Sequence, residues 1–212
     1  MSVGAAPGAG EPADFAARCA EVERLAASRD AEAGEALARL LLDPSWYLRE
    51  RVVEALGARH DVADAIRRAL REGEWWARAS ACDVIARRAD AAALDDLVAG
   101  VEDRNVFLQK SAVRAMVAVA ERTGLRFVAE RLAALDPAQR RRLLARVGHQ
   151  APHWVDSLAA ELAELPPGAL APGPAEGGAG AAAGEEDVEA RALVRFRAWL
   201  DAAAGAPRER RA

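Results

Sequence analysis

Few residues in this chain have the types and spacing that chemistry requires. His149 and His153 lie four residues apart, which is the spacing of two metal ligands on one helix face. Pro152 lies between them, and neither a cysteine nor a third histidine is near in the sequence, so a turn is the favoured interpretation. The chain also lacks the GxSxG, P-loop and HExxH motifs of hydrolases, nucleotide-binding proteins and metalloproteases. We therefore expect no catalytic residues, no metal and no cofactor.

Aromatic residues offer a different chemistry, the binding of a partner. Tyr47, Trp76 and Phe107 occupy corresponding positions in three helical segments, and residues four and seven positions further along share a helix face. Aromatic and arginine side chains are enriched in interface hot spots. The predicted partner-binding surface comprises Tyr47, Arg51, Trp76, Ser80, Asp83, Phe107, Arg114 and Arg140. The alternative is that the aromatic residues, including Trp46 and Trp75, pack between helices.

A repeated helical pattern positions these residues. Four acidic residues open similar segments at intervals of 29, 31 and 33 residues: Asp43, Glu72, Asp103 and Asp136. Six residues after these starts come Arg49, Arg78, Gln109 and Arg142, and nine after come Val52, Ala81, Ala112 and Ala145. Small residues let helices approach closely, and an arginine could pair with the acidic residue of the next repeat. The pairs predicted to set the stacking of repeats are Arg49 with Glu72 and Arg78 with Asp103.

The same periodicity predicts the individual helices. We expect helices over residues 12–27, from 75 to about 88, from 103 to 123, over 125–135, from 136 to a stop at Gly148, and over 154–165. Gly124 is expected to break the chain between two of them. No segment shows strict apolar/polar alternation, so no sheet is expected. The predicted fold class is therefore all-α.

The stretch from Asp43 to Gly57 is the clearest copy of the repeat. Its Leu48-Arg49 and Ala55-Leu56-Gly57 steps, echoed by Ala77-Arg78 and Val84-Ile85, resemble the HEAT repeat in the short bacterial form shared with phycobilisome lyase-type proteins. The resemblance covers roughly residues 30–165. It implies a short right-handed α-solenoid of about four helix pairs, whose second helices line a concave, partner-binding face. The function that it favours is a non-catalytic protein-interaction scaffold or adaptor.

Two further functions are implied by the same resemblance. Some HEAT-like proteins resemble alkylpurine DNA glycosylases, which use concave tryptophans and one aspartate around a damaged base. Trp76 and Asp83 lie seven residues apart and could face one groove, while Arg114, Arg140 and Arg141 could meet phosphates. The net charge of −4 argues against a dedicated nucleic-acid binder. The other possibility, a chromophore lyase-type subunit, is suggested by the repeat subtype alone.

Composition divides the chain into five segments. These are a disordered Gly/Ala/Pro-rich tail (1–10), the solenoid (11–165), a flexible Pro/Gly/Ala linker (166–184), an amphipathic helix (185–203) and a basic tail (204–212). Val188, Phe196 and Trp199 share an apolar stripe of the amphipathic helix and are its predicted docking residues, within this molecule or on a partner.

The sequence also indicates the location of the protein and the class of its partner. The N-terminal residues lack the pattern of a secretory signal, and no stretch approaches the roughly 18 apolar residues of a membrane span. Cys19 and Cys82 show neither a disulfide framework nor a zinc-site spacing. We expect a cytoplasmic protein whose partner is another protein, with neither a nucleic acid nor a membrane as its target.

Overall fold

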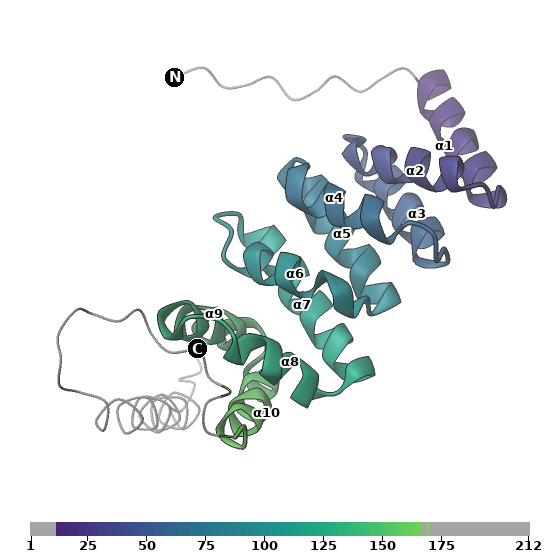
Figure 1. Ribbon diagram of the computed structural model, residues 1–212. Coiled ribbons are helices and arrows are strands. Elements are labelled where there is room, and N and C mark those ends of the chain that lie inside the picture. The colour runs from purple at the N-terminus through teal and green to yellow at the C-terminus, as the bar shows by residue number, and fades with distance from the viewer. Residues whose placement is uncertain (1–11, 167–168, 170–212) are drawn as a thin grey trace, which may run out of the picture. The chain divides into compact units, whose positions relative to one another are not determined.

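The computed structural model describes residues 12–166 and residue 169 of the 212-residue chain. Helices and their connecting turns make up this described part, which contains no strand, so the prediction of an all-α fold is confirmed for it (Figure 1). None of the described helices combines the length and the apolar character that crossing a membrane requires. The predicted helix 185–203, with Val188, Phe196 and Trp199, lies outside the described residues.

The described chain contains ten α-helices and two short 3-10 helices. The first six α-helices are α1 (Pro12–Ala27), α2 (Ala31–Arg39), α3 (Trp46–Gly57), α4 (Ala63–Glu72), α5 (Trp75–Arg88) and α6 (Leu94–Val101). The next four are α7 (Val106–Thr123), α8 (Leu125–Ala133), α9 (Pro137–Gln150) and α10 (Pro152–Ala163). The 3-10 helices η1 (Leu40–Leu42) and η2 (Ala91–Ala93) adjoin α2 and α6.

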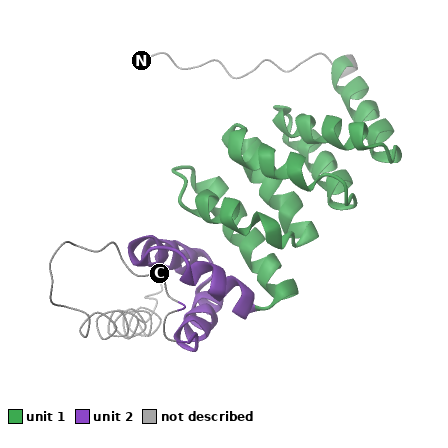
Figure 2. Ribbon diagram, viewed as in Figure 1, with its two compact units in different colours: residues 1–124 green, residues 125–212 purple. Residues whose placement is uncertain are grey.

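Two compact units divide the chain at residue 124 (Figure 2). In the first unit, residues 1–124, α3 packs between α1 and α5, and α5 packs against α7, while α4 contacts both α2 and α6. The pairs α4–α5 and α6–α7 join these two rows. In the second unit, residues 125–212, α10 packs against both α8 and α9. The predicted solenoid, residues 11–165, therefore spans parts of both units.

The core of the first unit is built from residues at repeated positions. Leu56, Ile85 and Met116 are fully buried, and so are the small residues Ala81 and Ala112. Because alanine projects little beyond the backbone, the helices that carry it can approach closely. The apolar face of each helix is thus covered by neighbours from its own row and from the other row.

The observed helix starts correct the predicted ones. The N-cap residues of α3, α5 and α7 are Ser45, Glu74 and Asn105, each two residues after the predicted acidic start. Asp43 accepts the backbone N–H of Ser45 at 2.8 Å, and Asp103 accepts that of Asn105 at 2.8 Å. Such local turns occupy the aspartates before the helix begins. Glu72 is instead the last residue of α4, so its prediction as a helix start is wrong.

The fourth repeat is out of register by two residues, because Asp136 itself is the N-cap of α9. Its carboxylate accepts the N–H groups of Ala138 at 3.0 Å and Gln139 at 2.9 Å. Counted from the N-cap, Arg140 corresponds to Arg49 and Arg78, whereas the sequence alignment gave that position to Arg142. In the corrected register, the buried Leu143 and Val147 occupy the same positions, counted from the N-cap, as the buried core residues of the other repeats.

The helix ends confirm some predictions and correct others. The predicted helices 12–27 and 75–88, and the end of α7 at Thr123, agree with the structure. Gly148 does not stop α9, which runs two residues further to Gln150, since a single glycine is tolerated inside a helix. The helix predicted over 125–135 ends at Ala133, and α10 begins at Pro152 rather than at residue 154.

Gly124 forms the whole connection between α7 and α8, and it has φ 93° and ψ 146°. A Cβ atom at this position would meet no atom within 4 Å, so the backbone conformation alone demands glycine. We predict that Gly124→Ala lowers the free energy of unfolding by about 1–3 kcal/mol in urea titrations followed by circular dichroism.

Ala89 provides the matched control for Gly124→Ala. Among the described residues, Ala89 is the non-glycine residue with a positive φ, which is 48°. It is the C-cap of α5 and has the left-handed conformation. Ala89→Gly should therefore leave stability unchanged or raise it by up to about 1 kcal/mol. Equal losses in both variants would contradict the conformational explanation.

Candidate functional site

A side chain four residues after each N-cap holds the turn that leads into the helix. Arg49 Nη1 donates to the carbonyl oxygens of Asp43 at 2.7 Å and Pro44 at 2.9 Å. Gln109 Nε2 donates to the carbonyl oxygen of Asp103 at 2.5 Å. A backbone carbonyl left unpaired next to a packed turn costs free energy, so these donors stabilise the first turn of each helix. We call Arg49, Arg78, Gln109 and Arg140 the turn braces.

The other two turn braces act in the same way. Arg140 Nη1 donates to the carbonyl oxygens of Ala133 at 2.9 Å and Leu135 at 3.3 Å. Its side chain is only 3% exposed, so the prediction of Arg140 as part of a partner-binding surface is wrong. Arg78 Nε donates to the carbonyl oxygen of Leu70, at the end of α4, at 2.9 Å.

Ion pairs link successive helices of the α1, α3, α5 and α7 row. Arg78 Nη1 lies 2.8 Å from Asp103 Oδ2, which confirms the predicted Arg78–Asp103 pair. Arg18 of α1 makes the equivalent contact with Asp43, at 2.5 Å. The predicted Arg49–Glu72 pair is wrong, since Arg49 binds turn carbonyls and Glu72 forms no ion pair within the described residues.

Burial and the nearby polar or charged partners shift the pKa values of these groups in opposite directions. Burial disfavours the ionised Asp103 carboxylate, but the Asn105 N–H and the Arg78 guanidinium outweigh it, so the pKa of Asp103 is lowered. Burial lowers the pKa of Arg49 despite the nearby Asp43 carboxylate, although an arginine stays protonated throughout. The Arg78–Asp103 pair therefore remains charged at neutral pH.

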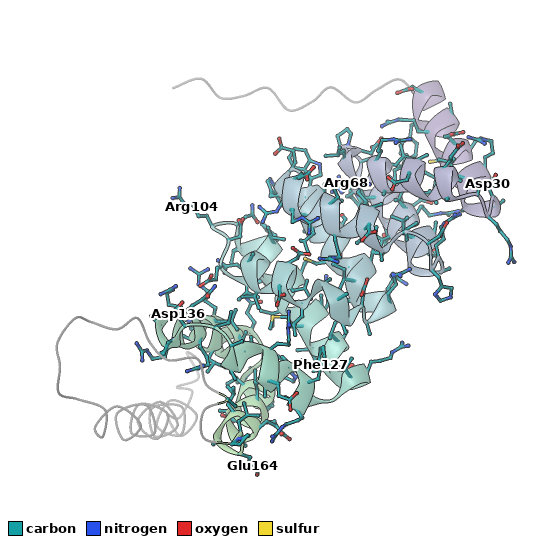
Figure 3. All side chains as sticks on the ribbon, viewed as in Figure 1. Asp30, Arg68, Arg104, Phe127, Asp136 and Glu164 are labelled. Carbon is teal, nitrogen blue, oxygen red and sulfur yellow. The ribbon has the colours of Figure 1, made fainter. Side chains whose placement is uncertain are left out.

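Six exposed apolar side chains lie at or just before the N-terminal turns of α3, α5 and α7. They are Leu42, Trp46, Tyr47, Trp75, Val106 and Phe107, and they are between 41% and 68% exposed. We call these six residues the aromatic rim. The turns that precede the three helices lie along one edge of the first unit (Figure 1), and Arg104, in the last of these turns, extends outward (Figure 3). An exposed apolar strip of this kind is typical of an interaction surface.

Ring contacts join the rim aromatics within two clusters. Trp75 stacks on Phe107, with ring centroids 5.8 Å apart, and meets Trp76 edge-on at 5.7 Å. Tyr47 contacts Trp46 at 6.0 Å and Phe15 of α1 at 6.1 Å. The contacts of Tyr47 with Phe15 and of Trp75 with Phe107 confirm packing between helices in part, while the exposed surface of the rings leaves the predicted binding role a prediction. Rings held in this way lose little conformational freedom when they bind.

The remaining predicted surface residues lie on helices α3, α5 and α7. Arg51 pairs with Glu23 at 3.2 Å, and Arg114 pairs with Asp83 one helix along the row. Ser80 and Trp76 are half-buried. Because Arg114 pairs with Asp83, this carboxylate serves as a cross-link between α5 and α7 in the described geometry.

A small hollow next to Tyr47 is lined by Cys19, Val22, Glu23, Tyr47, Leu48 and Arg51. Its volume is about 50 Å³, far below the roughly 300–1,000 Å³ of pockets that enclose small molecules. A single side chain of a partner is the size of group that the hollow admits. This hollow is therefore too small to enclose a metabolite.

Two further features concern the histidines and the buried cysteine. His149 lies in the last turn of α9 and His153 in the first turn of α10, on either side of the break at Ala151. Among the described residues, no three potential ligands gather around a common point. Burial, reinforced by the Asp83 carboxylate, raises the pKa of the Cys82 thiol, which keeps it protonated and unreactive.

Several of these features have sequence signals that the periodicity argument did not use. Asp43-Pro44-Ser45 and Asp103-Arg104-Asn105 share an Asp-x-Ser/Asn pattern, which locates the caps two residues further on. The exposure of Trp46 and Trp75 has no such signal, because it depends on how neighbouring helices pack. Comparison with protein families, with characterised proteins and with solved structures finds no match to this chain. The candidate surface therefore depends on the residues and contacts described above.

The Arg78–Asp103 pair predicts a pH-dependent contribution to stability. Since the folded-state pKa of Asp103 is lowered, its stabilising effect is present above the unfolded-state pKa of about 3.9 and is lost as the pH falls through the folded value. Asp103→Asn should lower the free energy of unfolding by about 1 kcal/mol at pH 7, and this loss should shrink as the pH falls through the folded-state pKa. Chemical denaturation across this pH range measures the difference.

Glu72→Gln is the matched control, because Glu72 is exposed and has no ion-pair partner in the described part of the chain. Its unfolding free energy should follow that of the unsubstituted protein at each pH. A loss for Asp103→Asn that stays constant from pH 7 to pH 3 would show that the charge of Asp103 contributes nothing.

The buried brace of the second unit gives a further prediction. Arg140→Ala leaves the carbonyl groups of Ala133 and Leu135 without their donor, and we expect a loss of about 1–3 kcal/mol in the free energy of unfolding. Arg140→Gln should lose about 1 kcal/mol or less, since Gln109 makes the same type of contact. The exposed neighbour Arg141 is the control, and Arg141→Ala should change stability by less than about 0.5 kcal/mol. Equal losses of stability in Arg140→Ala and Arg141→Ala would contradict the role of Arg140 as a turn brace.

Proposed function

We propose that this protein is a HEAT-like α-solenoid and acts as a non-catalytic scaffold or adaptor that binds another protein through the aromatic rim. The observation that carries the proposal is the gathering of six exposed apolar side chains along the N-terminal turns of three successive helices. Leaving this much apolar surface in water is unfavourable unless a partner covers it.

The repeated contacts of the first unit support the solenoid part of the proposal. Ion pairs recur between residues separated by about one repeat, namely Glu23–Arg51, Arg67–Asp96 and Asp83–Arg114. The turn braces recur at one position counted from the N-cap. Helix pairs that each bury their apolar face against the next pair are the basis of solenoid stability.

The composition of the rim supports a protein partner. Tryptophan, tyrosine and phenylalanine supply large contact areas at low entropic cost, and they dominate interface hot spots. Trp46 and Phe107 are the most exposed of the large apolar residues, so they are the strongest candidates for anchors. Arg51 and Arg114 lie further along the same helices, already oriented by Glu23 and Asp83, where they can contribute polar contacts at the border.

The experiment is affinity capture from extract of the native host with the full chain as bait, followed by mass spectrometry and binding measurements with the purified partner. Combined Trp46→Ala and Phe107→Ala substitutions should weaken partner binding at least about 30-fold, since hot-spot truncations cost about 2 kcal/mol or more each. The helical circular dichroism signal should be retained, because both side chains lie at the surface.

The matched control removes an exposed ion pair from the row formed by α2, α4 and α6. Glu35 of α2 and Arg68 of α4 pair at 2.8 Å, and both are about half exposed. Glu35→Ala with Arg68→Ala should leave the partner's dissociation constant within about twofold, since exposed ion pairs contribute little. Binding that survives the rim substitutions, or that is lost equally in the control, would falsify the proposed surface.

A further inference from the structure

We propose that two copies of this chain associate through the part of the aromatic rim on α5 and α7, with a two-fold axis between Trp75 and Phe107. The inference rests on the rim assigned under the proposed function, and it names a second copy of the chain as one occupant of that surface. In such a symmetric contact, the same surface patch meets itself, so that residue i of one copy contacts residue j of the other and j contacts i. The turn before α5 must therefore complement the turn before α7.

The apolar centre of the proposed contact is the ring pair Trp75 and Phe107. Their ring centroids lie 5.8 Å apart at an interplanar angle of 28°, and the two residues are 41% and 61% exposed. Val106, also exposed, precedes Phe107 in the first turn of α7. Because one ring comes from α5 and the other from α7, the pair forms one apolar surface across both helices. A two-fold axis at this pair brings four rings together, and aromatic pairs contribute beyond the area that they bury.

The turn before α5 is acidic. Glu72 and Glu74 precede Trp75 by three residues and one residue, both are exposed, and neither forms an ion pair within the described part of the chain. Glu74 is the N-cap of α5, yet its side chain accepts no hydrogen bond from the first turn of the helix. Both carboxylates are therefore available to cations of another molecule.

The first turn of α7 and the residue before its N-cap are basic. Arg104 precedes the N-cap Asn105 and extends outward (Figure 3). Lys110 lies four residues after Val106, on the same face of α7. Both cations are exposed, and among the described residues neither has an ion-pair partner.

The other charged groups near the ring pair are already engaged within the chain. Their ion pairs are Arg71–Asp96, Arg78–Asp103 and Arg114–Asp83. Glu102 is half-buried and also takes part in an interaction within the chain. Each copy thus offers two acidic side chains from the turn before α5 and two basic side chains from the start of α7.

This charge pattern fixes the position of the two-fold axis. With the axis between Trp75 and Phe107, the acidic turn of each copy faces the basic turn of the other copy, so the ionic contacts form twice. An axis through α5 would instead place Glu72 and Glu74 against their own equivalents, and an axis through α7 would do the same to the two cations. Like charges brought together in an interface cost free energy.

The exposed area determines the class of interface to expect. At about 150–250 Å² for a whole aromatic side chain, Trp75 and Phe107 leave about 200 Å² of ring surface in water on each copy. A stable interface buries about 800 Å² per partner, so Val106 and the four charged side chains have to supply much of the remainder. We therefore expect a reversible dimer with a dissociation constant of about 10–100 µM.

The α3 part of the rim stays outside this contact. Since α5 packs against both α3 and α7, the second copy's α5 and α7 turns lie over α7 and α5 and leave Leu42, Trp46 and Tyr47 uncovered. Arg49 and Arg51 of α3 are likewise outside it, bound to turn carbonyl groups and to Glu23. A dimer then presents two α3 clusters, which a partner with two matching sites binds with avidity.

Sedimentation velocity of the purified full chain, without any partner, tests the association. Between about 1 and 500 µM, the mass should rise from that of one chain to that of two, with a midpoint set by the expected dissociation constant. A mass that stays at one chain over this range would overturn the proposal. Growth beyond two chains would also overturn it, because a two-fold contact closes on itself.

The two exposed tryptophans locate the contact on the rim. Trp75→Ala should raise the dissociation constant of the dimer at least about tenfold, since each dimer loses the ring twice. Trp46→Ala removes the more exposed tryptophan, 68% against 41%, and should change the constant by less than about twofold. The opposite order of effects would show that α3 forms the contact and would overturn the proposed axis.

Charge exchange tests the orientation. Glu72→Lys with Glu74→Lys, and separately Arg104→Glu with Lys110→Glu, should each raise the dissociation constant at least about tenfold, because each variant faces like charge. An equimolar mixture of the two variants should recover association to within about threefold of the unsubstituted chain, since the introduced cations of one then meet the introduced anions of the other. A mixture that fails to recover would overturn the orientation.

The matched control is Glu54→Lys with Glu121→Lys, which makes the same change of charge on α3 and α7 away from their first turns. Both residues are exposed, and Glu121 lies about 22 Å along α7 from Val106 at 1.5 Å per residue. This variant should dimerise within about twofold of the unsubstituted chain. A loss equal to that of Glu72→Lys with Glu74→Lys would show a general effect of net charge and overturn the ionic match. Since the charge variants keep every apolar rim residue and no partner is present, these outcomes are separate from the capture experiment.

Discussion

The turn braces are the interaction on which the rest of the structure depends. The connections that lead from α2, α4 and α6 into α3, α5 and α7 are short, and their carbonyl groups need donors if the turns are to pack closely. Arg49, Arg78 and Gln109 supply those donors from within the rim helix, while Arg140 does so in the second unit. The same contact therefore fixes the direction in which each rim helix leaves its turn and the position of the aromatic residues on that turn.

Packing between the helices then needs little side-chain volume. Ala77, Ala81, Ala112 and Ala115 are fully buried, so backbones approach closely and larger side chains such as Leu48 and Leu108 fill the remaining space. No tryptophan is among the buried core residues of the described chain. The large rings are consequently left at the ends of the helices, where they contact one another and remain accessible. The composition of the core and the presence of the rim are two results of the same constraint.

The periodicity of the sequence was enough to predict the all-α fold and several helix bounds, including those of α1 and α5. Local signals misled the prediction at the fourth repeat, because Asp136 caps its own helix whereas Asp43 and Asp103 stabilise the turn before theirs. Arg140 was predicted at the surface for that reason. The pairing of Arg18 with Asp43 and the exposure of Trp46 depend on which helices become neighbours, and a pattern within one helix does not contain this information.

The hydrogen bonds of the turn braces and the ion pairs between helices respond differently to pH. Arg49 and Gln109 donate to backbone carbonyl groups, and neither an arginine nor an amide loses its donors as the solution becomes acidic. Carboxylates such as Asp103 do lose their charge. Acidification thus weakens the cross-links between these helices and also removes the carboxylate charge that Asp43 and Asp103 bring to their own turns, whereas the donors of the turn braces remain.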